Sequence, residues 1–329
     1  MLSLRCFPAV LITTVICQCF EVDAQKLSFV VLADWGGLPK FPFRTPIEEA
    51  VAARLADVGG RINASFVLAL GDNFYYDGVT DVDDPRFQET YNQVFLSSSL
   101  DINWYLVAGN HDHNGNITAQ IAYSKLVKRW NYPALYYKLS FSIPGTTRHI
   151  DILMTDSIVL CGNTRSDFLY EQPPGPRSIN EAEKQWTWLE ENLATSKADY
   201  LIVTGHYPVY SIAEHGPTFC LLDRMMPLLH KYKVTAYLSG HDHNLQHLAT
   251  TAFNATVDYF ISGAADFIDA SKKHKADVPK GSSKFHWADI FTFGGLGCIE
   301  VNDEELVFTF VEASGKQLYR HSTKRRSQS

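Results

Sequence analysis

The stretch Gly71-Asp72-Asn73-Phe74-Tyr75 directly follows the apolar run Phe66 to Leu70. A short apolar run bounded by turn residues is typical of a buried strand, so we expect Asp72 to lie where that strand leaves its sheet. Open α/β sheets bind ligands at this edge. A carboxylate and a tyrosine this close together suit a strongly acidic ion such as iron(III). Taken alone, the stretch fits a Gly-Asp turn with aromatic packing better than it fits a metal site.

Other apolar runs along the chain end in polar residues of the same kind. The polar segments are Asp34-Trp35-Gly36, Gly109-Asn110-His111-Asp112-His113, Gly205-His206-Tyr207-Pro208 and Gly240-His241-Asp242-His243. Together with Asp72, these strand ends present carboxylate, amide and imidazole donors to one edge of a sheet. We hypothesise that they converge on a pair of metal ions.

The remaining histidines are interpreted as ordinary core or surface residues, because a lone histidine is seldom a ligand. This group comprises His113, His230, His247, His274 and His286. His149 and His321 show no case for a catalytic role either.

Residues 1–24 have the pattern of a signal peptide: Arg5, then an apolar run from Phe7 to Phe20, then small residues before Gln25. The apolar run is too short to span a bilayer comfortably. We therefore predict a secreted or lysosomal protein whose mature chain, residues 25–329, forms a single catalytic domain. An uncleaved anchor is the alternative.

The formal net charge is -7, and it becomes -6 when Arg5, Glu21 and Asp23 leave with the signal peptide. A mildly acidic chain gives no electrostatic reason to expect a nucleic-acid or membrane partner. The basic cluster 324–326 is interpreted as a frayed terminus.

Three cysteines remain in the mature chain, namely Cys161, Cys220 and Cys298. An odd number allows at most one internal bridge. Cys298 lies in a strand-like segment and should be a buried free thiol, so we predict a Cys161–Cys220 disulfide, which stabilises by about 4 kcal/mol on the loop-entropy model. Glycosylation sequons, which fit the same oxidising compartment, begin at Asn63, Asn116 and Asn254.

Strand and helix patterns alternate along the chain, which predicts a layered α/β fold with antiparallel strands towards the end. Pro46 to Val58 reads as a helix capped by Thr45. Asn180 to Leu193 reads as another, with Asn180 as its cap. The turn-rich stretch 156–179 between strands and helix is long enough to indicate a functional or disordered loop.

On these motifs the chain resembles the purple acid phosphatases of the small, tartrate-resistant type, within the metallophosphoesterase superfamily. The family's five blocks stand here at Asp34, Asp72 to Tyr75, Asn110 to Asp112, His206 and His241 to His243. Tyr75 separates this family from Ser/Thr phosphatases and nucleases that share the other blocks. The resemblance covers essentially the whole mature chain and implies a metallophosphoesterase-like sandwich of two mixed β-sheets flanked by helices.

Residue by residue, the resemblance implies a dinuclear centre. Asp34, Tyr75 and His243 would bind iron(III), and Asn110, His206 and His241 would bind a divalent ion, with Asp72 as the bridge. Iron(II) is the favoured second ion, and zinc or manganese are alternatives. The assignment agrees with the donor chemistry, because the set with two anionic oxygens suits the harder ion.

The resemblance also implies hydrolysis of phosphomonoesters by a metal-bound hydroxide in an acidic medium, with His111 as general acid and His215 assisting. Two other readings keep the same ligands: an iron-binding or transport protein, and a redox protein that generates reactive oxygen species. The acid–base pair favours hydrolysis, because a carrier does not need it. Within hydrolases, nucleotide or diester specificity is the alternative.

Two further features concern regulation and substrate specificity. In the family the loop containing Ser166 to Leu169 covers the site, so 156–179 is interpreted as a repression loop cut by an activating protease; an ordinary surface loop is the alternative. Asp266 stands where we expect asparagine in mammalian-type members. Its extra carboxylate either disfavours dianionic substrates or points away from the site.

Overall fold

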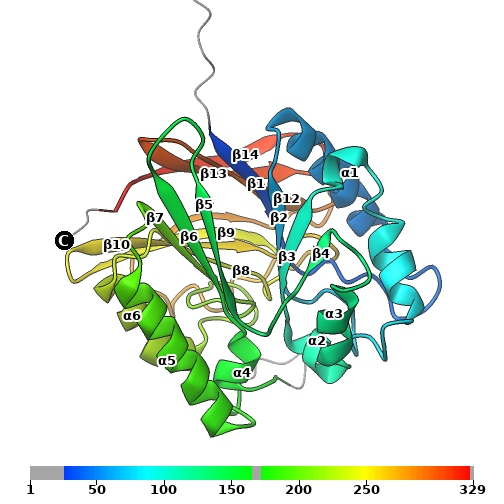
Figure 1. Ribbon diagram of the computed structural model, residues 1–329, viewed down its shortest axis with the longest axis horizontal. Helices are drawn as coiled ribbons and strands as arrows, with labels where there is room; N and C mark the ends of the chain where they lie inside the picture. The colour runs from blue at the N-terminus through cyan, green and yellow to red at the C-terminus, as the bar shows by residue number, and fades with distance from the viewer. Residues whose placement is uncertain (1–25, 165–171, 327–329) are drawn as a thin grey trace, which may run out of the picture.

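The computed structural model describes residues 26–164 and 172–326. The predicted signal peptide and the segment Ser166 to Leu169 lie outside these residues. Two seven-stranded sheets pack face to face, and helices cover their outer faces (Figure 1). This is the predicted sandwich of mixed sheets with flanking helices.

The first sheet has the order β14-β13-β12-β1-β2-β3-β4. Its strands are β1 (Leu27–Leu32), β2 (Phe66–Leu70), β3 (Asn103–Val107), β4 (Trp130–Asn131), β12 (Gly295–Val301), β13 (Glu305–Glu312) and β14 (Gln317–Lys324). Strands β1 to β4 run parallel, whereas β12 to β14 are antiparallel to their neighbours.

The second sheet has the order β11-β9-β10-β8-β7-β6-β5. Its strands are β5 (Tyr137–Ser142), β6 (His149–Met154), β7 (Tyr200–Thr204), β8 (Ala236–Ser239), β9 (Leu245–Ala252), β10 (Ala255–Ser262) and β11 (Ser283–Trp287). The central strands β6, β7, β8 and β10 are parallel, and the pairs at both edges are antiparallel. The antiparallel end of the chain was predicted, although β9 and β14 were not.

Helices lie on the outer face of each sheet. They are α1 (Pro46–Arg61), α2 (Asn110–Asn114), α3 (Ile117–Tyr123), α4 (Ser157–Cys161), α5 (Ile179–Thr195) and α6 (Met226–Lys231), with π-helical turns at Phe87–Asn92 and Leu221–Met225 and a 3-10 turn at Ser98–Leu100. In Figure 1, α1 to α3 lie beside the first sheet and α4 to α6 beside the second.

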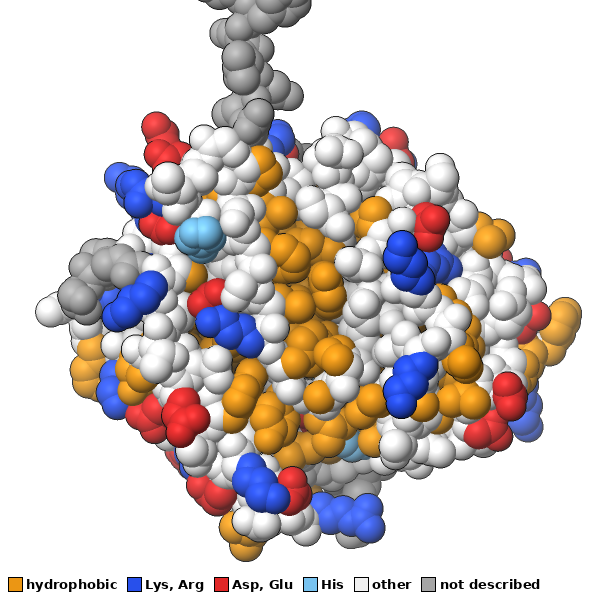
Figure 2. Space-filling model, in the orientation of Figure 1, with side chains coloured by type: hydrophobic (Ala, Val, Ile, Leu, Met, Phe, Trp, Pro, Cys, Tyr) orange, Lys and Arg blue, Asp and Glu red, His pale blue; other side chains and the backbone are white. Residues whose placement is uncertain are grey.

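Strand β1 shows why the layers form. Its side chains alternate between faces, so Val30 and Leu32 pack against the helix layer while Phe29 and Val31 enter the core between the sheets. Burying each of the larger side chains contributes about 1.5–3 kcal/mol. On the side seen in Figure 2, a band of hydrophobic side chains runs between β5–β6 and β2–β3, where the inner core comes closest to the surface.

Two sequence predictions are wrong, one about the start of a helix and one about the end of the chain. Helix α5 begins at Ile179, and its cap is Ser178, whose hydroxyl accepts from the Glu181 amide, rather than Asn180. Within the described residues, the basic terminus is held by contacts and is not frayed. The Arg326 guanidinium donates to the carbonyls of Ser196 and Ala198 at 2.7 and 2.6 Å, which holds the chain end against the second sheet.

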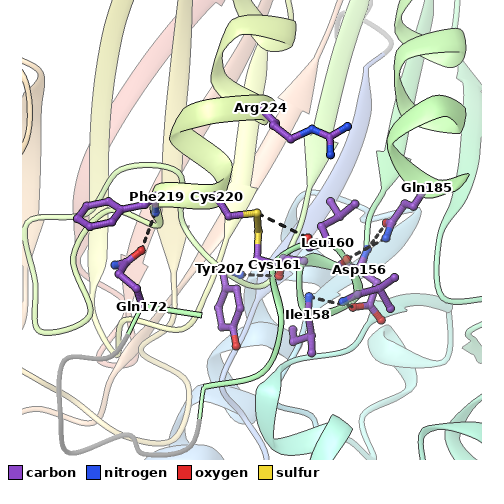
Figure 3. The surroundings of a disulfide bond; sticks show 12 residues. Asp156, Ile158, Leu160, Cys161, Gln172, Gln185, Tyr207, Phe219, Cys220 and Arg224 are labelled. Carbon is purple, nitrogen blue, oxygen red and sulfur yellow. Dashed lines mark hydrogen bonds between the residues drawn. A yellow bond between two sulfur atoms is a disulfide. The ribbon is translucent and has the colours of Figure 1, made fainter. Parts of the chain in front are cut away.

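The predicted disulfide is confirmed. Cys161, at the end of α4, is bonded to Cys220 with a Cα–Cα distance of 5.7 Å, and Figure 3 shows the bridge among its neighbours. Cys298 is free and buried, as predicted. Helix α4 itself was not predicted; the Asp156 side chain caps it by accepting from the amides of Ile158 and Val159. No helix within the described residues has the length and apolarity that crossing a bilayer requires.

Candidate metal centre

The predicted ligands lie on loops that leave the carboxyl ends of strands in both sheets. Asp34 and Asp72 follow β1 and β2, and Asn110 follows β3 in the first sheet. His206 follows β7, and the segment 241–243 follows β8 in the second sheet. Because the sheets pack face to face, these strand ends meet at one rim of the sandwich.

The backbone at this rim is held in uncommon conformations. Asp34, Asp72 and His241 have φ values of 59°, 51° and 71°, in the left-handed region that non-glycine residues seldom adopt. Each such residue costs on the order of 1–3 kcal/mol and persists only where its surroundings enforce it. Gly109 is required for a different reason, because a Cβ there would lie 2.0 Å from Asp72 Oδ1.

Three of the predicted ligands form one group. The Tyr75 hydroxyl lies 3.2 Å from Asp34 Oδ1 and 3.0 Å from His243 Nε2. His243 Nε2 lies 3.7 Å from Asp34 Oδ1, which closes the triangle. Donor atoms at such separations can all contact one ion.

A second group surrounds His206. Its Nε2 lies 3.0 Å from Asn110 Oδ1 and 3.3 Å from Asp72 Oδ2. Ligand atoms of Asp72, His206 and His241 all lie within 4.8 Å of one another. The two groups adjoin, because His206 Nε2 is also 4.0 Å from Asp34 Oδ1. All the predicted ligands are buried except His243, whose side chain is 18% exposed and opens the site to solvent.

The electrostatics of the site fit a pair of cations. Burial raises the pKa of Asp34, and the neighbouring Asp72 carboxylate raises it further. Burial would lower the pKa of His206, but Asp72 and Asp34 outweigh it and raise that pKa to about 9. Two buried carboxylates therefore demand positive charge at this rim. The donors present, carboxylates, a phenol, an amide and imidazoles, suit iron, zinc or manganese.

Asp112 organises two of the ligand loops, a role the sequence did not reveal. Its buried carboxylate accepts from the amides of Gly109, Asn73 and Phe74 and from the Gln120 side chain. It thereby ties the loop after β2 to the loop after β3. The signal was its place in the block Asn110 to Asp112, where only the first two residues received a role.

Arg86 supports the loop that carries Tyr75. Its guanidinium donates to the carbonyls of Gly36, Tyr75 and Gly78, which joins the loops after β1 and β2. Nothing in the local sequence marks this residue, because its acceptors are backbone atoms up to 50 positions away.

The two predicted acid–base histidines both border the cluster. His111 Nδ1 lies 2.6 Å from the Tyr76 carbonyl, and its Nε2 lies 3.9 Å from Asp72 Oδ2. The His215 ring stacks on His241 with 4.1 Å between centroids. The amide of His215 donates to Asp242 Oδ1, so the residue between the two ligand histidines also fixes His215.

Asp266 lies beside the start of α1. Its buried carboxylate accepts from the Thr45 hydroxyl, and burial raises its pKa to about 7. Its neighbour Phe267 is the residue that packs on the ligands, with ring centroids 5.1 Å from Tyr75 and 5.5 Å from His243.

Comparison with known proteins agrees with this geometry. Residues 27–245 match the calcineurin-like phosphoesterase family. The human protein named tartrate-resistant acid phosphatase type 5 is 49% identical over 302 residues, covering 92% of this chain and 92% of the human one. The Arabidopsis thaliana protein named purple acid phosphatase 7 is 28% identical, covering 92% of this chain and 87% of its own.

Among solved structures, GAP50 of Plasmodium, described as an anchor in the inner membrane complex, aligns with a TM-score of 0.76 and 24% identity, covering 92% of this chain and 90% of its own. The purple acid phosphatase of yellow lupin aligns with a TM-score of 0.63 and 15% identity, covering 92% and 54%. These structures share the fold, whereas the human relative also shares half of the sequence. The chain therefore belongs to the calcineurin-like phosphoesterases and, among them, to the purple acid phosphatases of the tartrate-resistant type.

Proposed function

We propose that this protein is an acid phosphatase that hydrolyses phosphomonoesters at a dinuclear metal centre. The observation that carries the proposal is the convergence of seven donors in two adjoining groups, namely Asp34, Tyr75 and His243 in the first and Asp72, Asn110, His206 and His241 in the second. The first group would hold iron(III), because it contributes two anionic oxygens besides the shared carboxylate. The second would hold a divalent ion, with iron(II) favoured over zinc or manganese.

A metal pair of this kind acts as a Lewis acid on phosphate oxygens and supplies an acidified water as the nucleophile. The chain's own residues set where the phosphate binds. His243 leaves part of the site open to solvent, and His111 and His215 border the cluster. An incoming phosphate ester would therefore meet imidazole groups as it reaches the ligands.

His111 is oriented as a proton donor. A carbonyl oxygen can only accept, so the contact with Tyr76 places a hydrogen on His111 Nδ1. The second nitrogen, Nε2, then faces Asp72 and gains its hydrogen only when the ring is protonated. In an acidic medium the imidazolium can pass this proton to the departing alcohol oxygen, and His215 would assist from the His241 side.

The stretch 156–179 is proposed as a repression loop opened by an activating protease. Its described end is attached near His215, because Gln172 accepts from the Phe219 amide at 2.7 Å (Figure 3). Gln172 also donates to the Pro217 carbonyl at 2.9 Å. A cut within the loop would leave this attachment joined to the rest of the chain on one side only. Cleavage between Asp167 and Arg177 with no change in turnover would remove the proposal.

We also propose that the protein is secreted or lysosomal and carries glycans. Asn63, Asn116 and Asn254 are all exposed, which glycosylation requires. Asn116 also caps α3 through its side-chain oxygen, and its side-chain nitrogen donates to the Thr80 carbonyl at 3.0 Å. Loss of mass on glycosidase treatment of the secreted protein would test this.

The role of His111 is tested with two leaving groups. His111→Ala should lower kcat by about 10²–10⁴-fold for an alkyl phosphate, whose alcohol needs a proton to leave. The loss should be much smaller for p-nitrophenyl phosphate, because nitrophenolate leaves without one. Metal content should equal that of the parent. The matched control is His149→Ala, at an exposed histidine on β6. This substitution should leave kcat for both substrates unchanged. Equal losses for both substrates would remove His111 from the general-acid role.

A further inference from the structure

A second cluster of histidine and carboxylate joins the two sheets. His247 on β9 and Asp258 on β10 belong to the second sheet, while His321 lies on β14 of the first. His247 Nε2 lies 2.9 Å from Asp258 Oδ1, and His321 Nε2 lies 3.3 Å from Asp258 Oδ2. The ligand atoms of all three lie within 4.8 Å of one another.

These separations match the geometry of a tetrahedral zinc site. Zinc bonds of about 2.0–2.1 Å to nitrogen and oxygen place neighbouring ligand atoms about 3.3 Å apart. The 2.9 Å distance from His247 ends on Asp258 Oδ1 and the 3.3 Å distance from His321 ends on Oδ2, so each histidine lies at about this spacing from one carboxylate oxygen. Binding one ion would require the carboxylate to turn one oxygen towards both nitrogens. Two imidazoles and one carboxylate are ligands that zinc prefers.

The surrounding side chains orient the three groups as metal ligands. The Tyr319 hydroxyl lies 2.8 Å from His247 Nδ1, so that nitrogen can donate its hydrogen and leave the lone pair on Nε2 for a metal. The Thr323 hydroxyl donates to Asp258 Oδ2 at 2.6 Å and fixes the carboxylate. Burial lowers the pKa of His247, which keeps its ring neutral, as binding requires.

We propose that His247, Asp258 and His321 bind a divalent zinc ion that clamps strand β14 to the second sheet. His247 and Asp258 are almost fully buried, whereas the His321 side chain is 32% exposed. A water can therefore complete the coordination from the His321 side. The site is formed by residues other than the ligands of the proposed catalytic centre and needs none of them.

The test is zinc titration of the purified full-length protein with its catalytic metals loaded, read by calorimetry and by metal analysis after dialysis. His321→Gln removes the exposed ligand from an edge strand, and His149→Gln is the matched control on β6. The parent and His149→Gln should bind one more zinc ion per chain than His321→Gln, and zinc should raise their thermal midpoint but not that of His321→Gln.

Comparing variants separates this site from zinc exchange at the catalytic centre, because the catalytic centre is the same in all three proteins. Phosphatase turnover should be equal for all of them. Zinc binding of the same stoichiometry and affinity in the parent and in His321→Gln would overturn the proposal. So would a thermal midpoint that zinc shifts equally in both.

Discussion

Asp72 and Asp258 are buried aspartates that each contact a histidine nitrogen, and they differ in where the chain places them. Asp72 and His206 lie on loops after strand ends, and Asp72 has a left-handed backbone. Asp258 and His247 lie within regular strands. Loops after strand ends can bring donor side chains from both sheets together at one point and leave that point accessible to substrate. Strand positions instead fix side chains against one another, which suits a cross-link.

The pKa values of the buried aspartates depend on the groups that contact them. For Asp72 and Asp258 burial would raise the pKa, but neighbouring histidines outweigh it and lower that pKa below its usual range. Asp266 is just as buried but accepts from the Thr45 hydroxyl, and its pKa is raised to about 7. Contacts with neighbouring histidines therefore decide whether a buried carboxylate stays ionised, and each of the three can be tested separately.

The largest effect is expected at the shared carboxylate. Asp72→Asn should lower phosphatase kcat by more than about 10³-fold, beyond the loss caused by removing one electrostatic donor from an active site. Bound metal should fall with it, as measured by elemental analysis. The matched control is Asp83→Asn, at an exposed aspartate of the same loop region. Full metal content together with full activity in Asp72→Asn would show that Asp72 is not the bridge.

The next effect contrasts Asp258 with Asp72. Asp258→Asn should leave turnover unchanged and reduce the free energy of unfolding at pH 7 by about 1.5–3 kcal/mol, the usual range for hydrogen bonds to a charged group. Because the pKa of Asp258 is lowered on folding, its contribution is present above the unfolded value near 3.8 and is lost as the pH falls below it.

The measurement is urea unfolding of the parent and Asp258→Asn at pH 7 and pH 3, with chelator present to remove zinc. The difference between the proteins should shrink at pH 3. A difference that grows on acidification would contradict this interpretation of the cluster.

The smallest effect concerns the carboxylate without a histidine contact. Folding raises the pKa of Asp266 from 3.8 to about 7, so its ionisation costs stability as the pH rises through that value. The stability of Asp266→Asn relative to the parent should therefore be greater at pH 8 than at pH 5, by about 2 kcal/mol, because part of the loss has already occurred at pH 5, where the unfolded aspartate is ionised. Thermal unfolding at both pH values checks this prediction. A larger gain in stability at pH 5 than at pH 8 would contradict it.

The sequence predicted which residues meet at the candidate metal centre because each of them follows an apolar run, so local pattern and chemistry coincide. It predicted α1 and its Thr45 cap for the same local reason, whereas the Cys161–Cys220 bridge followed once Cys298 was assigned to a strand. It missed the cluster of His247 and His321, because their alternation within strands resembles ordinary packing and their common partner lies on another strand. Arg86 was missed since its acceptors are backbone carbonyls brought together only by the fold.

The central claim is that Tyr75 and its neighbours hold a pair of metal ions, one of them iron(III). The direct test is metal analysis with a visible absorption spectrum of the parent and of Tyr75→Phe, which removes only the phenolic oxygen. The parent should contain two metal ions at this centre and absorb visible light through the tyrosinate bound to iron. Tyr75→Phe should lose that absorption. A colourless, iron-free parent, or a band that persists unchanged in Tyr75→Phe, would contradict the account.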